Sequence, residues 1–382
     1  MVIKSKIVYL MVFLFSMFLT EVSQAAIILL KSGQSVQGSI LEETSQQVKL
    51  DVSGIVFTYY KEEVQSITLE EQDLMKVPVR KISYKVSKTF AFTSLVDLET
   101  LQFNYPLSHQ NIPNQSVSNE IISPNPNAVT KDPDGNQIGT FYFSNLKAGE
   151  VHRVRVSFDV TLNEPQIKVD RTRVADMYQI FTRDMDIFLQ VKDASSEEQQ
   201  LAKKITQGLV NPYDKAKAIY DYVVSHFTYQ NIQNFSGKQE TFGTLVSQKG
   251  NCRDISRLFL VLSRLNGIPT KEVNGVAFQP KDSSEVCQTN AGHSWNEIYL
   301  PGYQWRPVDA TFGLTEPKKF FLFPYEIHIP ECYGEIVSTD KGSLYDGSSI
   351  RMSARSQISS DSVHNDLNIE IEHVKTEKLK GR

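Results

Sequence analysis

Residues 251–269 read NCRDISRLFLVLSRLNGIP and predict one helix with defined ends. Asn251 is a favourable N-cap residue, and Asp254 occupies the N3 position, where its side chain can complete a capping box. Gly267 and Pro269 end the helix. Apolar residues recur on one face at helical spacing: Ile255, Leu258, Phe259, Leu262 and Leu265. The apolar face predicts a helix packed against a core.

Cys252 occupies the first helical position of this segment. The N-terminus of a helix stabilises negative charge, which favours the thiolate form of a cysteine. Its free N–H groups can also bind an oxyanion. Gln248, four residues earlier, is either a second donor or an ordinary surface residue. The alternative for a single cysteine is a buried structural residue, since free cysteines are often buried.

Two further motifs predict a β-hairpin. They read GHSWNE (292–297) and WRPVDAT (305–311), and Pro301-Gly302 between them is a turn signal. Strands are expected at 293–300 and 304–310, after an earlier one at 271–278. A turn centred at 301 places His293 opposite Asp309, to within one residue of register, where side chains are about 4.5–5.5 Å apart.

A thiol, an imidazole and a carboxylate are the parts of an acyl-transfer site. Asp309 can accept a hydrogen bond from one ring nitrogen of His293 and leave the other nitrogen for Cys252. Trp295 is on the same strand face as His293, as a wall of the site or as core. The alternative is a hairpin whose histidine and aspartate are unrelated.

These motifs, in this order, resemble those of the transglutaminase-like superfamily. The resemblance covers about residues 210–314, including the helix before the cysteine, Tyr213 to Tyr229. It implies a papain-like α+β core with Cys252 as nucleophile, His293 as base and Asp309 as the residue that orients the base. No counterpart of the calcium sites of animal transglutaminases is visible, so no metal and no cofactor are predicted.

Strand patterns precede and follow this core. Five short strands in residues 26–70 predict a small all-β, barrel-like unit. After a charged linker, residues 78–165 alternate and predict a β-sandwich, with long loops at 106–137. The catalytic domain is assigned to 170–325, and its order of elements predicts an α+β class. Residues 326–382 are predicted to be a C-terminal extension, partly disordered, with a frayed tail.

The N-terminus has the pattern of a secretory signal peptide. Two lysines precede an apolar run, Ile7 to Leu19, and small residues predict cleavage after Ala25. The run has 13 positions, fewer than the roughly 20 that a spanning helix needs. We therefore expect a periplasmic or secreted protein with no stable membrane span after cleavage.

Charge and cysteine content limit the partners. The net charge is −4, or −5 without the signal segment, which carries two lysines and one glutamate. A weakly acidic chain with no basic run is a poor nucleic-acid binder. Of the three cysteines, Cys252 is expected to be unpaired, which leaves Cys287 and Cys332 as a possible disulfide or as two thiols.

The predicted activity is thiol-dependent acyl transfer on peptide, protein or cell-wall amides. The thioester intermediate is resolved by water in a peptidase or amidase, or by an amine in a cross-linking transglutaminase. Hydrolysis is favoured because amine transfer requires a site that excludes water. A non-catalytic envelope binding or scaffold protein with the same fold is the alternative from another class.

Overall fold

The chain divides into two compact units, Met1–Gln72 and Asp73–Arg382, which are taken separately. The computed structural model describes residues 24–52, 55–69, 79–107, 112, 114–132, 134–165, 167–174, 186–192, 194–230, 240–278, 286–334, 349–353 and 362–379. The predicted signal segment lies outside these residues as far as Ser23. No helix in the described ranges is long and apolar enough to cross a membrane.

The N-terminal unit is a five-stranded antiparallel sheet. Its strands are β1 Gln24–Leu30, β2 Ser35–Glu43, β3 Gln47–Val52, β4 Ile55–Tyr60 and β5 Val64–Leu69. The order is β4-β3-β2-β1-β5, so β4 and β5 are the two edges within the described part of the unit. A barrel closes through a ladder between its edge strands, and the predicted barrel is therefore an open sheet here.

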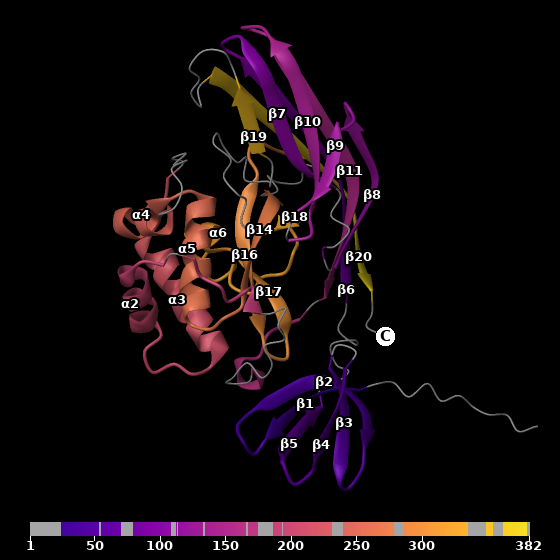
Figure 1. The fold of residues 1–382 in the computed structure, drawn as a ribbon, viewed down its shortest axis with the longest axis vertical. Helices are drawn as coiled ribbons and strands as arrows, with labels where there is room; N and C mark the ends of the chain where they lie inside the picture. The colour runs from indigo at the N-terminus through magenta and orange to yellow at the C-terminus, as the bar shows by residue number, and fades with distance from the viewer. Residues whose placement is uncertain are drawn as a thin grey trace, which may run out of the picture. The chain divides into compact units, whose positions relative to one another are not determined.

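The larger unit contains the predicted β-sandwich (Figure 1). One sheet has the order β19-β7-β10-β9, and the other β15-β20-β6-β11-β8. Of these, β15 is Val286–Thr289, β19 is Ser349–Ser353 and β20 is Val363–Leu379. The strands from the first half of the chain are β6 Val79–Ser94, β7 Leu98–Leu107, β8 Gln115–Ser123, β9 Ala128–Lys131, β10 Gln137–Leu146 and β11 Val151–Pro165. The long loops predicted at 106–137 are wrong, because β8 and β9 lie there.

Buried aromatic side chains dominate the sandwich core. Phe90 and Phe92 of β6 meet Phe103 of β7, with ring centroids 4.8 Å and 4.9 Å from it. On β11 the buried residues alternate as the sequence predicts: Val154, Val156, Phe158 and Val160. Burial of one large apolar side chain contributes about 1.5–3 kcal/mol, so this shared core holds the two sheets together.

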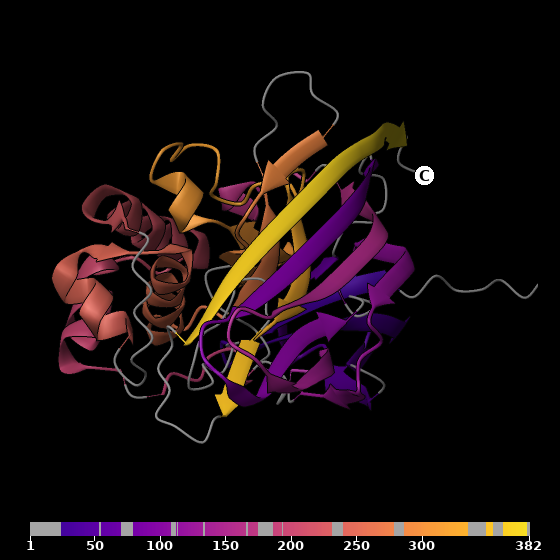
Figure 2. The same ribbon diagram turned by 90° about the horizontal axis from the view of Figure 1, so that it is seen from above.

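The C-terminal segment corrects a prediction. It contains β18 His328–Tyr333, β19 Ser349–Ser353 and β20 Val363–Leu379. β20 lies between β6 and β15 in the middle of a sandwich sheet, and Figure 2 shows it running alongside β6. The frayed tail was predicted at 375–382, after a possible strand at 367–374, but residues 375–379 continue β20 and pair with β6. Residues 369–372 are also paired with β15, and Ile369 and Ile371 are buried in the sandwich core.

The predicted α+β core follows β11 along the chain. Its helices are η2 Arg171–Arg173, α2 Ser196–Ile205, α3 Pro212–His226, α4 Glu240–Ser247, α5 Cys252–Leu265 and α6 Ala310–Gly313. The strands in this part of the chain are β12 Thr228–Tyr229, β13 Lys249–Gly250, β14 Thr270–Ala277, β15 Val286–Thr289, β16 His293–Leu300 and β17 Gln304–Val308, and of these β15 belongs to the sandwich. The main sheet has the order β17-β16-β14-β18.

This sheet lies between the helices and the sandwich (Figures 1 and 2). The predicted apolar face of α5 is buried against α3, where Tyr220 and Val223 are fully covered. On the sandwich side, Val276 and Ile329 join the core of the sandwich. The boundary predicted at residue 325 is therefore wrong, because β18 completes the sheet on which the site is built.

Candidate active site

Cys252 begins α5, as the sequence predicts. The Asn251 side chain accepts a hydrogen bond from the Asp254 N–H, and the Asp254 carboxylate accepts one from the Asn251 N–H, at 3.1 Å and 3.0 Å. This reciprocal capping box fixes the helix start, a contribution of about 1 kcal/mol. Cys252 is only 3% exposed, so its thiol lies in a largely water-excluded position at the positive end of a helix.

The hairpin brings His293 and Asp309 together, but in a different register from the one predicted. Asn296 pairs with Val308 and Leu300 with Gln304, so the hairpin is centred on Gly302, one residue later. Asp309 lies just beyond the last paired residue of β17. The two side chains still meet: His293 Nε2 is 2.7 Å from Asp309 Oδ2.

Asp309 reaches His293 because the chain turns into a helix at this point. Asp309 is the N-cap of α6, and its Oδ1 accepts hydrogen bonds from the N–H groups of Thr311 and Phe312, both at 2.9 Å. These two bonds orient the carboxylate and leave Oδ2 for side-chain donors. Asp309 is fully buried, so its position is fixed by local backbone structure.

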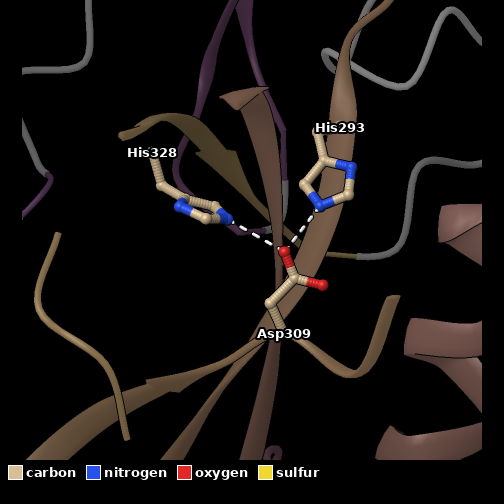
Figure 3. Close-up of side chains that lie close together, drawn as sticks. All are labelled: His293, Asp309 and His328. Carbon is tan, nitrogen blue, oxygen red and sulfur yellow. Dashed lines mark hydrogen bonds and ion pairs between the residues drawn. The ribbon is translucent and has the colours of Figure 1, made fainter. Parts of the chain in front are cut away.

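A second histidine contacts the same oxygen. His328 Nε2 is 2.9 Å from Asp309 Oδ2, and Figure 3 shows this oxygen between the two imidazole rings. His328 is on β18 and is fully buried. Sequence analysis missed it because residues 326–382 were assigned to an extension. Its position between Ile327 and Ile329, in an apolar run, is the signal that could have indicated a buried strand.

The charges of these groups differ in spite of their shared partner. Burial lowers the pKa of His293, but the charge and hydrogen bond of Asp309, together with Cys252, outweigh it and raise the pKa to about 10. Burial lowers the pKa of His328, and its bond to Asp309 does not reverse that. Burial would raise the pKa of Asp309, yet His293 and His328 hold it well below its usual range.

Cys252 completes the contact chain. A side-chain hydrogen bond between Cys252 and His293 is among the causes of the raised pKa of His293. Since Nε2 of His293 is bonded to Asp309, the ring nitrogen that faces the thiol is Nδ1. The structure therefore brings the three predicted side chains together in the order thiol, imidazole, carboxylate.

Trp295 and Gln248 have different surroundings. Trp295 is fully buried and stacks on His293, with ring centroids 5.9 Å apart, and its Nε1 donates to the Tyr325 hydroxyl at 3.2 Å. It is therefore both core and a wall of the site. Gln248 is exposed, and its carbonyl oxygen accepts from the Thr228 N–H at 3.0 Å. Its predicted role as an oxyanion donor stays a prediction.

Of the two alternatives predicted for Cys287 and Cys332, the structure has two thiols and no disulfide between them. The reason is topological. Cys287 is on β15, which pairs with β20 in the sandwich, and Cys332 is on β18, which pairs with β14 in the other sheet. Two different sheets thus hold the two thiols, whereas a disulfide requires a close approach of both Cα atoms.

His293, Asp309 and His328 also form a set of possible metal ligands. Each offers one ligand atom, and the three atoms lie within 4.8 Å of one another. A metal ion here would replace both hydrogen bonds to Asp309 Oδ2 and take His293 away from its contact with Asp309. The donor set could therefore hold an ion only at the expense of the thiol–imidazole–carboxylate arrangement.

The sequence comparisons identify relatives of the core. Residues 199–310 match the family model of the transglutaminase-like superfamily. The uncharacterized protein YebA of Bacillus subtilis is 30% identical over 259 residues, which cover 63% of this chain and 32% of YebA. An uncharacterized protein of Haemophilus influenzae is 30% identical over 124 residues, 28% of this chain and 34% of that protein. The chain thus spans about a third of the length of these relatives.

A solved structure has the same arrangement of elements. It is a candidate cysteine protease from Cytophaga hutchinsonii, with a TM-score of 0.59 and 18% identity, and the match covers 79% of this chain and 94% of that one. At this identity the likeness concerns the fold alone. Residues 199–310 thus match a transglutaminase-like core, and the likeness to the solved structure supports a papain-like α+β fold for it.

Proposed function

We propose that this protein is a cysteine-dependent acyl-transfer enzyme that hydrolyses peptide or protein amides. The observation that carries the proposal is the continuous contact from Cys252 through His293 to Asp309. Each group has the partner that its step requires: the thiol has a base, and the base has a buried carboxylate that sets its orientation.

In the proposed resting state Nδ1 of His293 holds the thiol proton of Cys252, because the raised pKa of His293 keeps its ring protonated at neutral pH. The thiolate then attacks the carbonyl carbon of the amide, a C–S bond forms and the C=O π electrons move to oxygen. The imidazolium gives its proton to the leaving nitrogen as the C–N bond breaks, which leaves a thioester on Cys252. The ionised Asp309 stabilises the imidazolium and does not itself take a proton.

The oxyanion is proposed to bind at the start of α5. The Cys252 N–H is at a helix N-terminus, where backbone donors lack intrahelical partners. Gln248 remains the proposed second donor, since it lies in the turn that leads into this helix. Burial raises the pKa of Tyr229 and the charge of Cys252 raises it further, so Tyr229 is another group within electrostatic range of the thiol.

Water is the proposed acceptor of the acyl group. It attacks the thioester after His293 removes one of its protons, and Cys252 leaves as a thiolate. Tyr229, which interacts electrostatically with Cys252, is half exposed to solvent. Amine transfer would require water to be excluded there. We place the reaction in the periplasm or outside the cell, with envelope peptides or cell-wall cross-bridges as substrates.

Mass spectrometry can test the nucleophile directly. Wild type, Cys252→Ala and Cys287→Ser are treated with iodoacetamide at neutral pH, and the modified residue is mapped. We expect rapid labelling at Cys252 in wild type and in Cys287→Ser, and loss of that rapid label in Cys252→Ala. Equal labelling rates in wild type and Cys252→Ala would contradict an activated thiol.

The acyl donor and acceptor need a second measurement. Wild type is incubated with envelope extract and quenched in acid, and the peptide that contains Cys252 is searched for an added acyl mass. A fluorescent primary amine is supplied in parallel. An acyl mass without amine incorporation supports hydrolysis, whereas amine incorporation supports a cross-linking transglutaminase. Absence of both from wild type would favour a non-catalytic scaffold.

A further inference from the structure

The buried imidazole of His328 forms a hydrogen bond with Asp309. Its Nε2 bonds to Asp309 Oδ2 at 2.9 Å. Its other ring nitrogen, Nδ1, is buried and has no hydrogen-bond partner within the described residues. An ionised carboxylate only accepts, so Nε2 carries a hydrogen. Burial lowers the pKa of His328, so Nδ1 carries none. His328 is thus a neutral imidazole that donates one hydrogen bond.

The surroundings of His328 are aromatic. Phe323, Trp295 and Phe312 approach the ring with centroids at 4.5 Å, 5.0 Å and 5.3 Å. The charged groups that act on it are Asp309, His293 and Lys319. An apolar side chain would fill such a pocket without leaving a buried nitrogen unpartnered, which costs stability. The feature that an apolar residue lacks is the N–H aimed at Asp309.

The strand that carries His328 is held from both sides. Gly275 of β14 allows a close approach, because a Cβ atom there would overlap the Ile329 carbonyl oxygen of β18. On the other side, the sandwich residue Lys88 forms a fully buried ion pair with Glu331 of β18. Gln115 of β8 also donates to the Pro330 carbonyl oxygen at 3.0 Å. His328 is therefore set in place by two domains.

We propose that His328 is a positioning residue of the site, which holds Asp309 Oδ2 in the direction of His293 and so keeps Nδ1 of His293 facing Cys252. The proposal rests on the proposed function. Two donors on Oδ2 and two backbone donors on Oδ1 give the carboxylate four hydrogen bonds, and they leave it one orientation. Loss of the His328 donor would free Asp309 to rotate on Oδ2 and would weaken its support of the imidazolium.

Two variants of equal polarity separate positioning from packing. In His328→Gln the amide nitrogen lies as many bonds from Cα as Nε2 does, so it can still donate to Asp309. In His328→Asn the amide nitrogen falls at the place of Nδ1 and does not reach. Both are neutral, and both disturb the aromatic pocket. The rate of Cys252 alkylation is measured against pH for each, with thermal unfolding and, on an acyl substrate, kcat and KM.

We expect His328→Asn to raise the pH midpoint of Cys252 alkylation and to lower kcat about 10- to 100-fold, the size of a lost hydrogen bond to a charged group. KM should not change, because His328 is fully buried and touches no substrate. His328→Gln should restore most of both.

Three results would overturn the proposal. The first is a pH midpoint of Cys252 alkylation in His328→Asn equal to that of wild type. The second is an equal loss of kcat in His328→Asn and His328→Gln. The third is a variant with lower thermal stability but an unchanged alkylation midpoint, which is the result expected if His328 acts by packing alone. Alkylation needs no substrate, so it stays informative if the proposed function fails. In that case wild type turns over no amide while the two variants still differ in their pH profiles.

Discussion

Two strands bring an imidazole to one carboxylate oxygen, and the two imidazoles behave in opposite ways. β16 brings His293 and β18 brings His328, with Nε2 at 2.7 Å and 2.9 Å from Asp309 Oδ2. The pKa of His293 is raised and that of His328 is lowered. The second nitrogen faces Cys252 in His293 and has no hydrogen-bond partner in His328 within the described residues. Burial and the charges of His293 and Lys319 also lower the pKa of His328. The same bond therefore supports a base in one case and a fixed donor in the other.

Asp309→Asn should remove the basis of this comparison and have the largest effect. Without the carboxylate, burial dominates at both rings, and the pKa of His293 should fall below its ordinary value. We expect kcat to drop on the order of 10⁴-fold, as for the same change in a Ser-His-Asp triad. Titration of the histidine ring resonances by NMR checks the pKa, and a full kinetic comparison checks the rate. A His293 pKa that stays near 10 in this variant would be the contrary result.

Lys88→Met tests how the sandwich holds β18, the strand that carries His328. It leaves Glu331 buried beside the sandwich without its cationic partner. Removal of one member of a buried ion pair costs about 3–5 kcal/mol, whereas replacement of both by apolar residues is often neutral. Urea unfolding of Lys88→Met and of the double variant Lys88→Met/Glu331→Met measures this. A single variant as stable as wild type would argue against the ion pair as a link between the domains.

The stability of the folded protein at alkaline pH should depend on the charge of His293. The pKa of His293 is about 10 in the folded protein and about 6.5 when unfolded, so its charged form stabilises the fold fully below about pH 6.5. That contribution is lost as the pH rises through 10. We expect the urea midpoint of wild type to fall over this range and that of Asp309→Asn to fall less. Parallel curves for the two proteins would contradict the assignment.

Removal of metal ions should have the smallest effect. The proposed mechanism uses Nε2 of His293 and Oδ2 of Asp309 for their mutual hydrogen bond, and an ion bound there would occupy both. Dialysis against EDTA should therefore leave turnover and alkylation unchanged. Loss of activity on dialysis, with recovery on addition of zinc, would show that these atoms act as ligands.

Local signals made much of the site predictable. The capping box of Asn251 and Asp254 lies within four residues, and it identified the helix start at Cys252. The hairpin turn indicated the contact of His293 with Asp309, although the register was off by one turn position. The wrong register did not change the predicted contact, because Asp309 is the N-cap of α6 and its carboxylate points toward β16 in that conformation.

Contacts between distant segments were not predictable in the same way. His328 meets Asp309 only because β18 joins the sheet beside β14, out of chain order. In the N-terminal unit, by contrast, four of the five strands pair with their neighbours in sequence, and five strands were predicted there. Periodicity reports which residues are buried in a strand, but it carries no information about which distant strand is the partner.

The position of β20 has a consequence for the order in which the protein takes shape. Val363 pairs with Ser94, 269 residues earlier in the chain. At a synthesis rate of about 5–20 residues per second, β6 exists for roughly 15–50 s before its neighbour has been made. During that time one side of β6 is an unpaired edge that other chains could add to. The N-terminal sheet carries no such delay, because its five strands are complete by Leu69. A factor that binds nascent or exported chains would therefore find its longest-lived target at β6.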